Sequence, residues 1–290
     1  MLDVIKGFDP HDPTSIPTET RSRIQEALRQ HKSSKRRQYR IGVPKEYNTK
    51  ELEPTVRHAW LDTLSRLQNH GHSIRPISLR ATRSALAAYY VIAPAEASSN
   101  LAKYDGVRYG NKLVERESTK NVLYAATRGA DLGEEVKRRI LLGSYSLSAA
   151  AIDNYFIKAQ KVRRLVQQDF NKVFAFRNPL LSYDDESPTD EGVDVIITPT
   201  AQSLPPKLSA LAERGSVDTF SDDVLTVPAS LAALPAISVP VPIEDSKSRF
   251  QNLSRSIGLQ ILAQYGDDES VFEVAREIEG MFPVTNEVLP

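Results

Sequence analysis

The sequence predicts an α/β layer fold, because short apolar strands alternate with amphipathic helices along the chain. RIGVP at 40–44 reads as a short buried strand closed by a proline, and HSIRPISL at 72–79 reads as a second strand. Continuous apolar runs recur at 193–201, 234–242 and 256–263, each with the profile of a strand buried on both faces. The order strand, helix, strand near the start of the chain is how an α/β layer fold begins.

The N-terminal segment contains turn signals and then an amphipathic helix. Residues 1–17 contain one glycine and three prolines, and Asp9 and Asp12 are suited to turn positions. A helix is expected over about Thr20–Gln30. The basic stretch HKSSKRRQYR at 31–40 favours an exposed insert, with a nucleic-acid or localisation patch as the alternative.

The helix between the first two strands has a clear apolar face, which consists of Val56, Trp60, Leu64 and Leu67. Gly71 follows at the position of a helix C-cap. The next helix is expected over about Thr82–Ile92. Pro94 must then bend or restart this helix, because proline lacks an N–H and restricts the residue before it.

Polar side chains crowd the stretch behind Pro94: Glu96, Ser98, Ser99, Asn100, Asp105 and Arg108. They suit either a helix with a polar face that runs into a loop, or the wall of a site that holds a small polar molecule. A helix restarted at Pro94 would offer free N–H groups to such a site.

Two more helices are expected before the acidic, proline-containing insert at 182–192. In LGEEVKRRILLG, at 132–143, Arg138 and Arg139 cannot face the same way, so we expect one to be solvated and the other to reach inward. A long helix is then marked by an apolar stripe of Leu147, Ala151, Tyr155, Val162, Val166, Phe170 and Val173. A helix of about Glu269–Met281 ends the chain.

The composition excludes several classes of function. The chain has 290 residues, of which 40% are hydrophobic and 26% charged, and its 37 basic residues balance 37 acidic ones. No global field therefore points to nucleic acid or an anionic membrane. The absence of cysteine excludes disulfides, thiolate metal sites and a cysteine nucleophile. No apolar run approaches the roughly 18 residues that span a bilayer, and no targeting signal is recognisable, so no membrane partner is expected.

The sequence lacks the common short motifs of nucleotide binding and catalysis. GxxxxGK[ST], GxGxxG, HExxH and GxSxG do not occur, and the serine clusters at 98–99 and 144–146 lack a nearby histidine or lysine at a suggestive spacing. His70 and His72 are close together in NHGHS, where a surface turn is the expectation and a metal site the alternative. We predict no protein-bound metal.

Seven segments occur in an order that resembles the amidase signature family: IGVPKEY, YYVIAPAEASSNLAKYDGVRYG, GEEVKRRILLGSYSLS, QKVRRLVQQDF, DVIITPT, DDVLTVPASLAALPAISVPV and IGLQIL. The resemblance covers almost the whole chain from GFDPHDPTS onward. Within the family it is closest to the A subunits of glutamyl-tRNA(Gln) amidotransferases, because EASSNLAKYDGVRYG and EVKRRILLG are specific to them. It implies a single α/β domain over 1–290, with a mixed β-sheet flanked by helices.

The family's chemistry uses a lysine, a bridging serine and a nucleophilic serine, with the serines in and just after a GGSSGGS-type segment. No lysine or serine of this sequence matches these positions, so no catalytic residue is assigned and the chain alone is expected to be inactive. In the family that segment lies upstream of the region matching GFDPHDPTS. The resemblance therefore implies the C-terminal part of an amidase fold, with the N-terminal part missing.

By the same resemblance, three residues contact a bound glutamine. Tyr89 is the first tyrosine of YYVIA, Arg139 is the second arginine of EVKRR, and Asp223 precedes VLTVP. A guanidinium can bind an α-carboxylate through two parallel hydrogen bonds, a carboxylate can meet the α-ammonium, and a phenol can close the remaining side. From the residues alone, Tyr89 also suits a half-buried aromatic, Arg139 a surface arginine and Asp223 a loop or cap residue.

The resemblance also implies a multi-subunit enzyme of translation. The whole A subunit hydrolyses glutamine and passes ammonia to a B-type partner subunit, which uses ATP and Mg²⁺ to amidate Glu-tRNA(Gln); no cofactor is expected in this chain. A mitochondrial setting is expected, and a cytoplasmic one otherwise. Two alternatives stay open: an amidase for an amide that is not an amino acid, and a non-catalytic binding or assembly protein with an amidase fold.

Overall fold

A computed structural model describes residues 2–32, 38–109, 124–181, 191–206, 209, 223–243 and 256–282. Most of the acidic insert and the centre of the basic insert, at 182–190 and 33–37, lie outside the described residues. The chain groups into two compact units. Met1–Thr82 and Val166–Pro290 form the sheet unit, and Arg83–Leu165 forms the helical unit. The expectation of a single domain over 1–290 stays a prediction.

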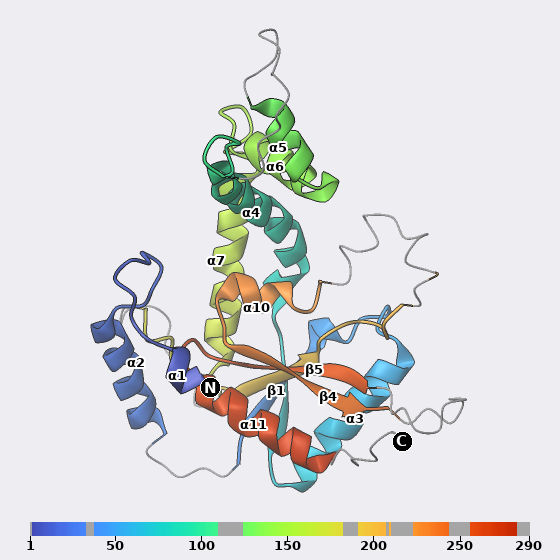
Figure 1. Ribbon diagram of the computed structural model, residues 1–290. Helices are drawn as coiled ribbons and strands as arrows, with labels where there is room; N and C mark the ends of the chain where they lie inside the picture. Colours follow the sequence, from blue (N-terminus) through green and yellow to red (C-terminus); the bar gives the residue numbers. More distant parts are fainter. Residues whose placement is uncertain are drawn as a thin grey trace, which may run out of the picture. The chain divides into compact units, whose positions relative to one another are not determined.

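The sheet unit is built on a five-stranded sheet in the order β2-β1-β3-β5-β4 (Figure 1). Its strands are β1 Arg40–Pro44, β2 Ser73–Ile77, β3 Val195–Pro199, β4 Ala236–Pro242 and β5 Ser256–Ala263. Strand β1 runs parallel to β2 and β3, whereas β5 runs antiparallel to β3 and β4. The sheet is therefore mixed, which confirms the predicted fold class.

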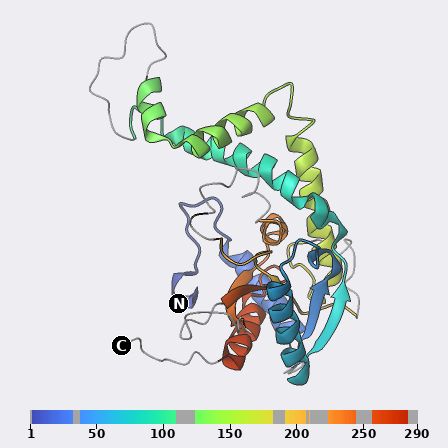
Figure 2. The same ribbon diagram turned by 90° about the vertical axis from the view of Figure 1, so that its right-hand side faces the viewer.

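Helices of the sheet unit include α1 Leu2–Ile5, α2 Thr18–His31, η1 Lys45–Tyr47, α3 Pro54–Asn69, α10 Val227–Ala232 and α11 Asp268–Met281. Helices α3 and α11 lie side by side against the sheet (Figures 1 and 2). The main apolar core lies between these two helices and the sheet. The predicted face of α3 is confirmed, since all four of its apolar residues are buried. Trp60 also donates a hydrogen bond from its indole Nε1 to the Ile197 carbonyl, 3.2 Å away.

Helix α3 ends where the sequence places its C-terminal signal. Gly71 adopts a φ of +97°, a left-handed conformation that glycine adopts without steric cost, and its N–H donates to the Gln68 carbonyl. The predicted turns near the N-terminus are also present, because the carboxylates of Asp9 and Asp12 accept backbone N–H bonds from His11 and Thr14.

Strand β4 departs from its predicted profile. The sequence predicts burial on both faces, but buried Val239 and Val241 alternate with exposed residues. The reason is that β4 is an edge strand, paired within the described residues to β5 alone. The Pro235 carbonyl accepts the N–H of Ala263, so residue 235 and every second residue after it direct their backbone polar groups toward β5. Pro240 and Pro242 are at the intervening positions, whose backbone faces away from β5, so their missing N–H does not interrupt the hydrogen bonds between the two strands.

Among the described residues, the helical unit contains α4 Ala85–Asn100, η3 Leu101–Lys103, α5 Ala125–Asp131, α6 Glu134–Ser146 and the first part of α7 Phe156–Val173. Of the two outcomes expected at Pro94, a bend or a restart of the helix, the restart does not occur, because α4 continues through the proline. Helix α6 packs against α4 at this point, and a Cβ on Gly143 would lie 2.0 Å from the Pro94 carbonyl oxygen. Close packing stabilises α4 where proline removes one of its own hydrogen bonds.

The long helix α7 begins later than its apolar stripe predicts. Residues 147–155 form turns, and Leu147 and Tyr155 are 37% and 48% exposed. From Phe156 the helix is regular, and Val166 and Phe170 are buried as expected. The turn-forming pair Asp153–Asn154 lies at the junction, which accounts for the delayed start.

Candidate substrate-recognition site

Tyr89 and Arg139 lie on facing helices of the helical unit. Tyr89 is on α4, Arg139 is on α6, and these two helices run side by side over most of their length (Figure 2). Tyr89 packs edge-on against Tyr90, with ring centroids 5.2 Å apart. Both tyrosines are within electrostatic range of the Arg139 guanidinium. Two of the three expected substrate contacts thus lie on helices that pack against each other in one unit.

Glu135 holds both arginines of the EVKRR segment. One of its carboxylate oxygens accepts from Arg138 Nη1 at 2.7 Å and the other from Arg139 Nε at 3.0 Å. This bond to Glu135 raises the pKa of the Arg139 guanidinium, and the nearby tyrosines contribute in the same direction. The sequence predicts that one of these arginines is solvated and that the other reaches inward. In the structure the two side chains are similarly exposed, Arg138 at 50% and Arg139 at 43%.

The bond from Nε leaves the outer end of the Arg139 guanidinium available. Among the described residues, its two terminal nitrogens make no hydrogen bond. These nitrogens form one edge of the planar group, and that edge can donate two parallel hydrogen bonds to a carboxylate. Arg139 can therefore keep its contact with Glu135 while it binds an anionic ligand.

Most of the polar cluster behind Pro94 is used in local contacts. Ser98 donates to the Ala95 carbonyl at 2.8 Å, and Asn100 donates to the Glu96 carboxylate at 3.1 Å, one turn away. The Asp105 carboxylate accepts backbone N–H bonds from residues 108 and 107, and these bonds lower its pKa. These contacts fit a helix that runs into a turn. Since α4 does not restart, it offers no free N–H groups at Pro94.

Asp223 belongs to the sheet unit, where it opens the turn that leads into α10. Its side chain is exposed, and its backbone carbonyl accepts N–H bonds from Thr226 at 3.1 Å and Val227 at 3.0 Å. The Thr226 hydroxyl donates to the same carbonyl at 3.2 Å. The turn that carries the carboxylate is thus fixed by its own backbone.

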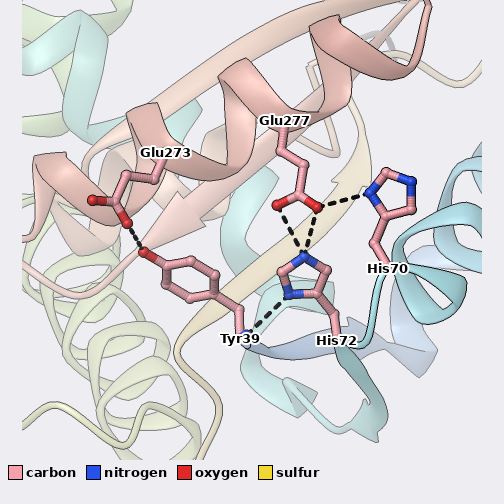
Figure 3. Close-up of polar contacts among 5 residues, drawn as sticks. All are labelled: Tyr39, His70, His72, Glu273 and Glu277. Carbon is pink, nitrogen blue, oxygen red and sulfur yellow. Dashed lines mark hydrogen bonds and ion pairs between the residues drawn. The ribbon is translucent and has the colours of Figure 1, made fainter. Parts of the chain in front are cut away.

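A polar cluster that the sequence did not predict lies between the start of the sheet and helix α11 (Figure 3). The Nδ1 of His72 accepts the N–H of Tyr39 at 2.9 Å, and its Nε2 lies 2.9 Å from both oxygens of Glu277. His70 Nδ1 reaches the same carboxylate at 3.1 Å, and the Tyr39 hydroxyl donates to Glu273. The expected surface turn at NHGHS is therefore only partly right, because the His72 side chain is 1% exposed.

The Tyr39–His72 cluster is a structural contact between distant parts of the chain. Its only sequence signal is the spacing of Glu273 and Glu277, which places two carboxylates on one face of α11. Burial and the neighbouring Glu273 both raise the pKa of the Tyr39 hydroxyl, which therefore donates its proton to that carboxylate. Among the described residues, no group of three or more histidine, aspartate or glutamate side chains is arranged to hold a metal ion.

A pocket of about 250 Å³ lies at the end of β3 in the sheet unit. Its walls are mainly apolar and consist of Val56, Thr200, Ala201, Ser203, Leu204, Pro205, Pro206, Ser256, Ile257 and Gly258. None of the three expected substrate contacts is among them. The described helices also include none with the length and apolar character that crossing a membrane requires.

Comparison with known proteins identifies the family. The Amidase family model matches residues 1–272. A protein of Coccidioides posadasii, named as the A subunit of a mitochondrial glutamyl-tRNA(Gln) amidotransferase, is 51% identical over 97% of this chain and 57% of its own length. A protein of the same name from Neurospora crassa is 44% identical over 93% of this chain and 56% of its own length.

Solved structures agree with this relationship. The A subunit of the glutamyl-tRNA(Gln) amidotransferase of Thermotoga maritima superposes with a TM-score of 0.61 at 29% identity, covering 97% of this chain and 50% of its own. A 6-aminohexanoate cyclic dimer hydrolase superposes with a TM-score of 0.63 over 97% of this chain and 52% of its own; at 21% identity it shows the fold alone. The chain spans 50–57% of the length of these glutamyl-tRNA(Gln) amidotransferase A subunits. By its sequence and its fold, the chain belongs to the amidase family.

Proposed function

We propose that residues 1–290 form the glutamine-recognising part of the A subunit of a mitochondrial glutamyl-tRNA(Gln) amidotransferase. The observation that carries this proposal is the identity of about half, over nearly the whole chain, with fungal proteins of that name. The segment around Arg139 supports it, because an exposed guanidinium edge beside two tyrosines suits an amino-acid substrate.

In the proposed reaction the amide of glutamine is hydrolysed and the ammonia passes to a B-type partner subunit. That partner uses ATP and Mg²⁺ to convert Glu-tRNA(Gln) to Gln-tRNA(Gln), and this chain itself holds no cofactor. The nucleophile and its base come from outside residues 1–290, since no lysine or serine here matches the family's triad. The chain's own contribution is substrate recognition and contact with the partner.

Each recognition residue has a distinct chemical role in this proposal. The outer edge of the Arg139 guanidinium binds the α-carboxylate in a bidentate manner, and the Tyr89 hydroxyl closes the side of the bound amino acid. Asp223 meets the α-ammonium. An amide that has neither the α-carboxylate nor the α-ammonium would make none of these charged contacts. The site would therefore bind an amino-acid amide more tightly than a neutral amide.

Arg139→Lys in the complete A subunit, assembled with its partner subunits, tests the proposal. Lysine keeps the charge but loses the two parallel hydrogen bonds, which costs on the order of 2–3 kcal/mol of transition-state binding. We expect a roughly hundredfold fall in kcat/KM for glutamine, since about 1.4 kcal/mol is a factor of ten. Glutamine hydrolysis is the measurement.

Arg138→Lys is the matched control, because Arg138 contacts the same Glu135 carboxylate but points about 100° away around α6. It should hydrolyse glutamine like the parent. 4-Aminobutanamide lacks the α-carboxylate and should be almost indifferent to Arg139→Lys. Equal glutamine turnover by both lysine variants and the parent would show that Arg139 does not bind the substrate.

A further inference from the structure

A row of polar side chains crosses the sheet unit where the surrounding strands are apolar. Gln260 on β5 lies directly opposite Thr198 on β3 and Ser238 on β4, so the three side chains share one face of the sheet. Gln260 is only 5% exposed and Thr198 is fully buried. Burial of an amide costs free energy unless its hydrogen bonds are satisfied, so Gln260 needs polar partners inside the unit.

Both N–H donors of the Gln260 amide are used. One donates to the Thr198 hydroxyl oxygen at 3.3 Å, and the other donates to the Leu225 backbone carbonyl, also at 3.3 Å. A carbonyl can only accept a hydrogen bond, so the Leu225 contact fixes which end of the amide is the nitrogen. The buried side chain thereby connects the middle of β5 to a turn outside the sheet.

That turn is the one that begins with Asp223. The Asp223 backbone carbonyl accepts three hydrogen bonds, two from Thr226 and one from Val227. Two residues further on, the Leu225 carbonyl accepts the hydrogen bond from Gln260. Leu225 and Val227 are both buried against the unit, whereas Asp223 is exposed. The backbone that carries the Asp223 carboxylate is thus fixed by hydrogen bonds within the turn and by the hydrogen bond from Gln260 in the sheet.

We propose that Gln260 is a positioning residue for Asp223 in substrate recognition. Gln260 makes no contact with glutamine; it fixes the turn from which the Asp223 carboxylate reaches the α-ammonium. The inference rests on the proposed function, because it takes Asp223 as the group that binds the ammonium. A buried amide so placed reduces the reorganisation needed when the substrate binds.

Gln260→Met in the complete A subunit with its partners is the test. Methionine is similar in size and apolar, and it removes the donor to Leu225 without opening a large cavity. We expect KM for glutamine to rise about tenfold with kcat within about twofold, the pattern of lost uniform binding. Glutaramic acid, which lacks the α-ammonium, should keep the parent's KM with this variant.

Gln264→Met is the matched control. Gln264 follows the same strand, is 1% exposed, and donates to the Asn171 side chain at 3.2 Å, away from the Asp223 turn. It removes an equally buried amide, so a merely structural role for Gln260 predicts similar kinetics from both variants. A selective glutamine defect in Gln260→Met, absent from Gln264→Met, supports positioning; equal behaviour of the two variants overturns it.

A gentler variant keeps the proposal testable if Gln260→Met does not fold. Thr198→Val removes the hydroxyl that orients the Gln260 amide, so the amide holds the Leu225 carbonyl less firmly while its own donor group is kept. We expect about a threefold rise in KM for glutamine and none for glutaramic acid. In the same variant, the N–H groups of Thr226 and Val227 should exchange with deuterium several-fold faster than in the parent. Unchanged exchange and unchanged KM would overturn the role of Gln260.

Asp223→Asn separates this inference from the proposed function. If Asp223→Asn leaves KM for glutamine unchanged, Asp223 does not bind the ammonium, and its proposed role in recognition fails together with the positioning role of Gln260. If Asp223→Asn raises that KM and Gln260→Met does not, the recognition role stands and only the positioning role fails. A rise in both, with glutaramic acid unaffected, supports both.

Discussion

At the scale of single residues, His72 shows how a polar side chain can be buried without loss of hydrogen bonds. Its Nδ1 accepts from the Tyr39 backbone, so in the neutral ring the proton lies on Nε2 and is donated to Glu277. Each ring nitrogen therefore has a hydrogen-bond partner: Tyr39, the residue before β1, and Glu277 on α11. The histidine links the first strand of the sheet to the last helix of the described chain.

His72→Ala should lower the free energy of unfolding of the chain by about 2–3 kcal/mol, because it leaves the Tyr39 N–H without a partner and opens a cavity. Urea unfolding is the measurement. His70→Ala is the control: its ring contacts the same carboxylate but is 51% exposed, and its loss should cost less than about 1 kcal/mol. Equal costs for the two variants would mean that burial of His72 is not the decisive difference.

Residue-level prediction from sequence succeeds where the signal is local. Gly71 could be assigned to a helix end from its neighbours alone, and its positive φ agrees. His72 could not, because its partner Glu277 lies 205 positions further along the chain. The roles of Tyr89, Arg139 and Asp223 are likewise predicted only from the family resemblance. These residues are far apart in the sequence, so no local pattern indicates that they bind one substrate.

At the scale of elements, the contact between α4 and α6 explains how one helix can contain a proline. Gly143 has no side chain, which allows the Pro94 carbonyl to approach the α6 backbone closely. The sequence shows the proline and its local cost but not the helix that packs against it. The burial of strand β4 and the first residue of α7 are predicted wrongly for a related reason. The pattern of apolar residues does not distinguish an edge strand from a central strand, or a turn from the first turn of a helix.

Gly143→Ala should destabilise the helical unit by about 1–3 kcal/mol, because the added Cβ meets backbone atoms that cannot rotate away as a side chain can. Thermal unfolding followed by circular dichroism is the measurement. Gly129→Ala is the matched control in α5, where nothing lies within 4 Å of the new Cβ. Because alanine favours helices, Gly129→Ala should stabilise by up to about 1 kcal/mol. Stabilisation by both alanines would contradict the tight contact.

At the scale of the whole molecule, the order of strands and helices was the most predictable property. All five strands and the helices at 18–31, 54–69, 134–146 and 268–281 follow from apolar runs and helical spacing. The sheet order β2-β1-β3-β5-β4 does not, because β3 joins β1 across more than 150 residues. Which strands pair across such a distance depends on packing, which composition and periodicity do not encode.

Residues 1–290 alone should show no glutaminase turnover above a buffer control, because no residue matches the lysine and serines that activate and perform the attack. Ammonia release from glutamine is the measurement. The complete A subunit with its partners is the positive control. Turnover by residues 1–290 that a single Ser→Ala change within them abolishes would reveal a nucleophile that the resemblance does not include.

The prolines of β4 also decide what can be added to the sheet at that side. A chain that joins a fibril needs a donor at every second position of the strand it extends. On the outward side of β4, Ala236 and Ser238 supply an N–H, but Pro240 and Pro242 do not. Templated growth that starts along this strand therefore stops half-way, and β4 resists amyloid-like addition without any charged residue on it.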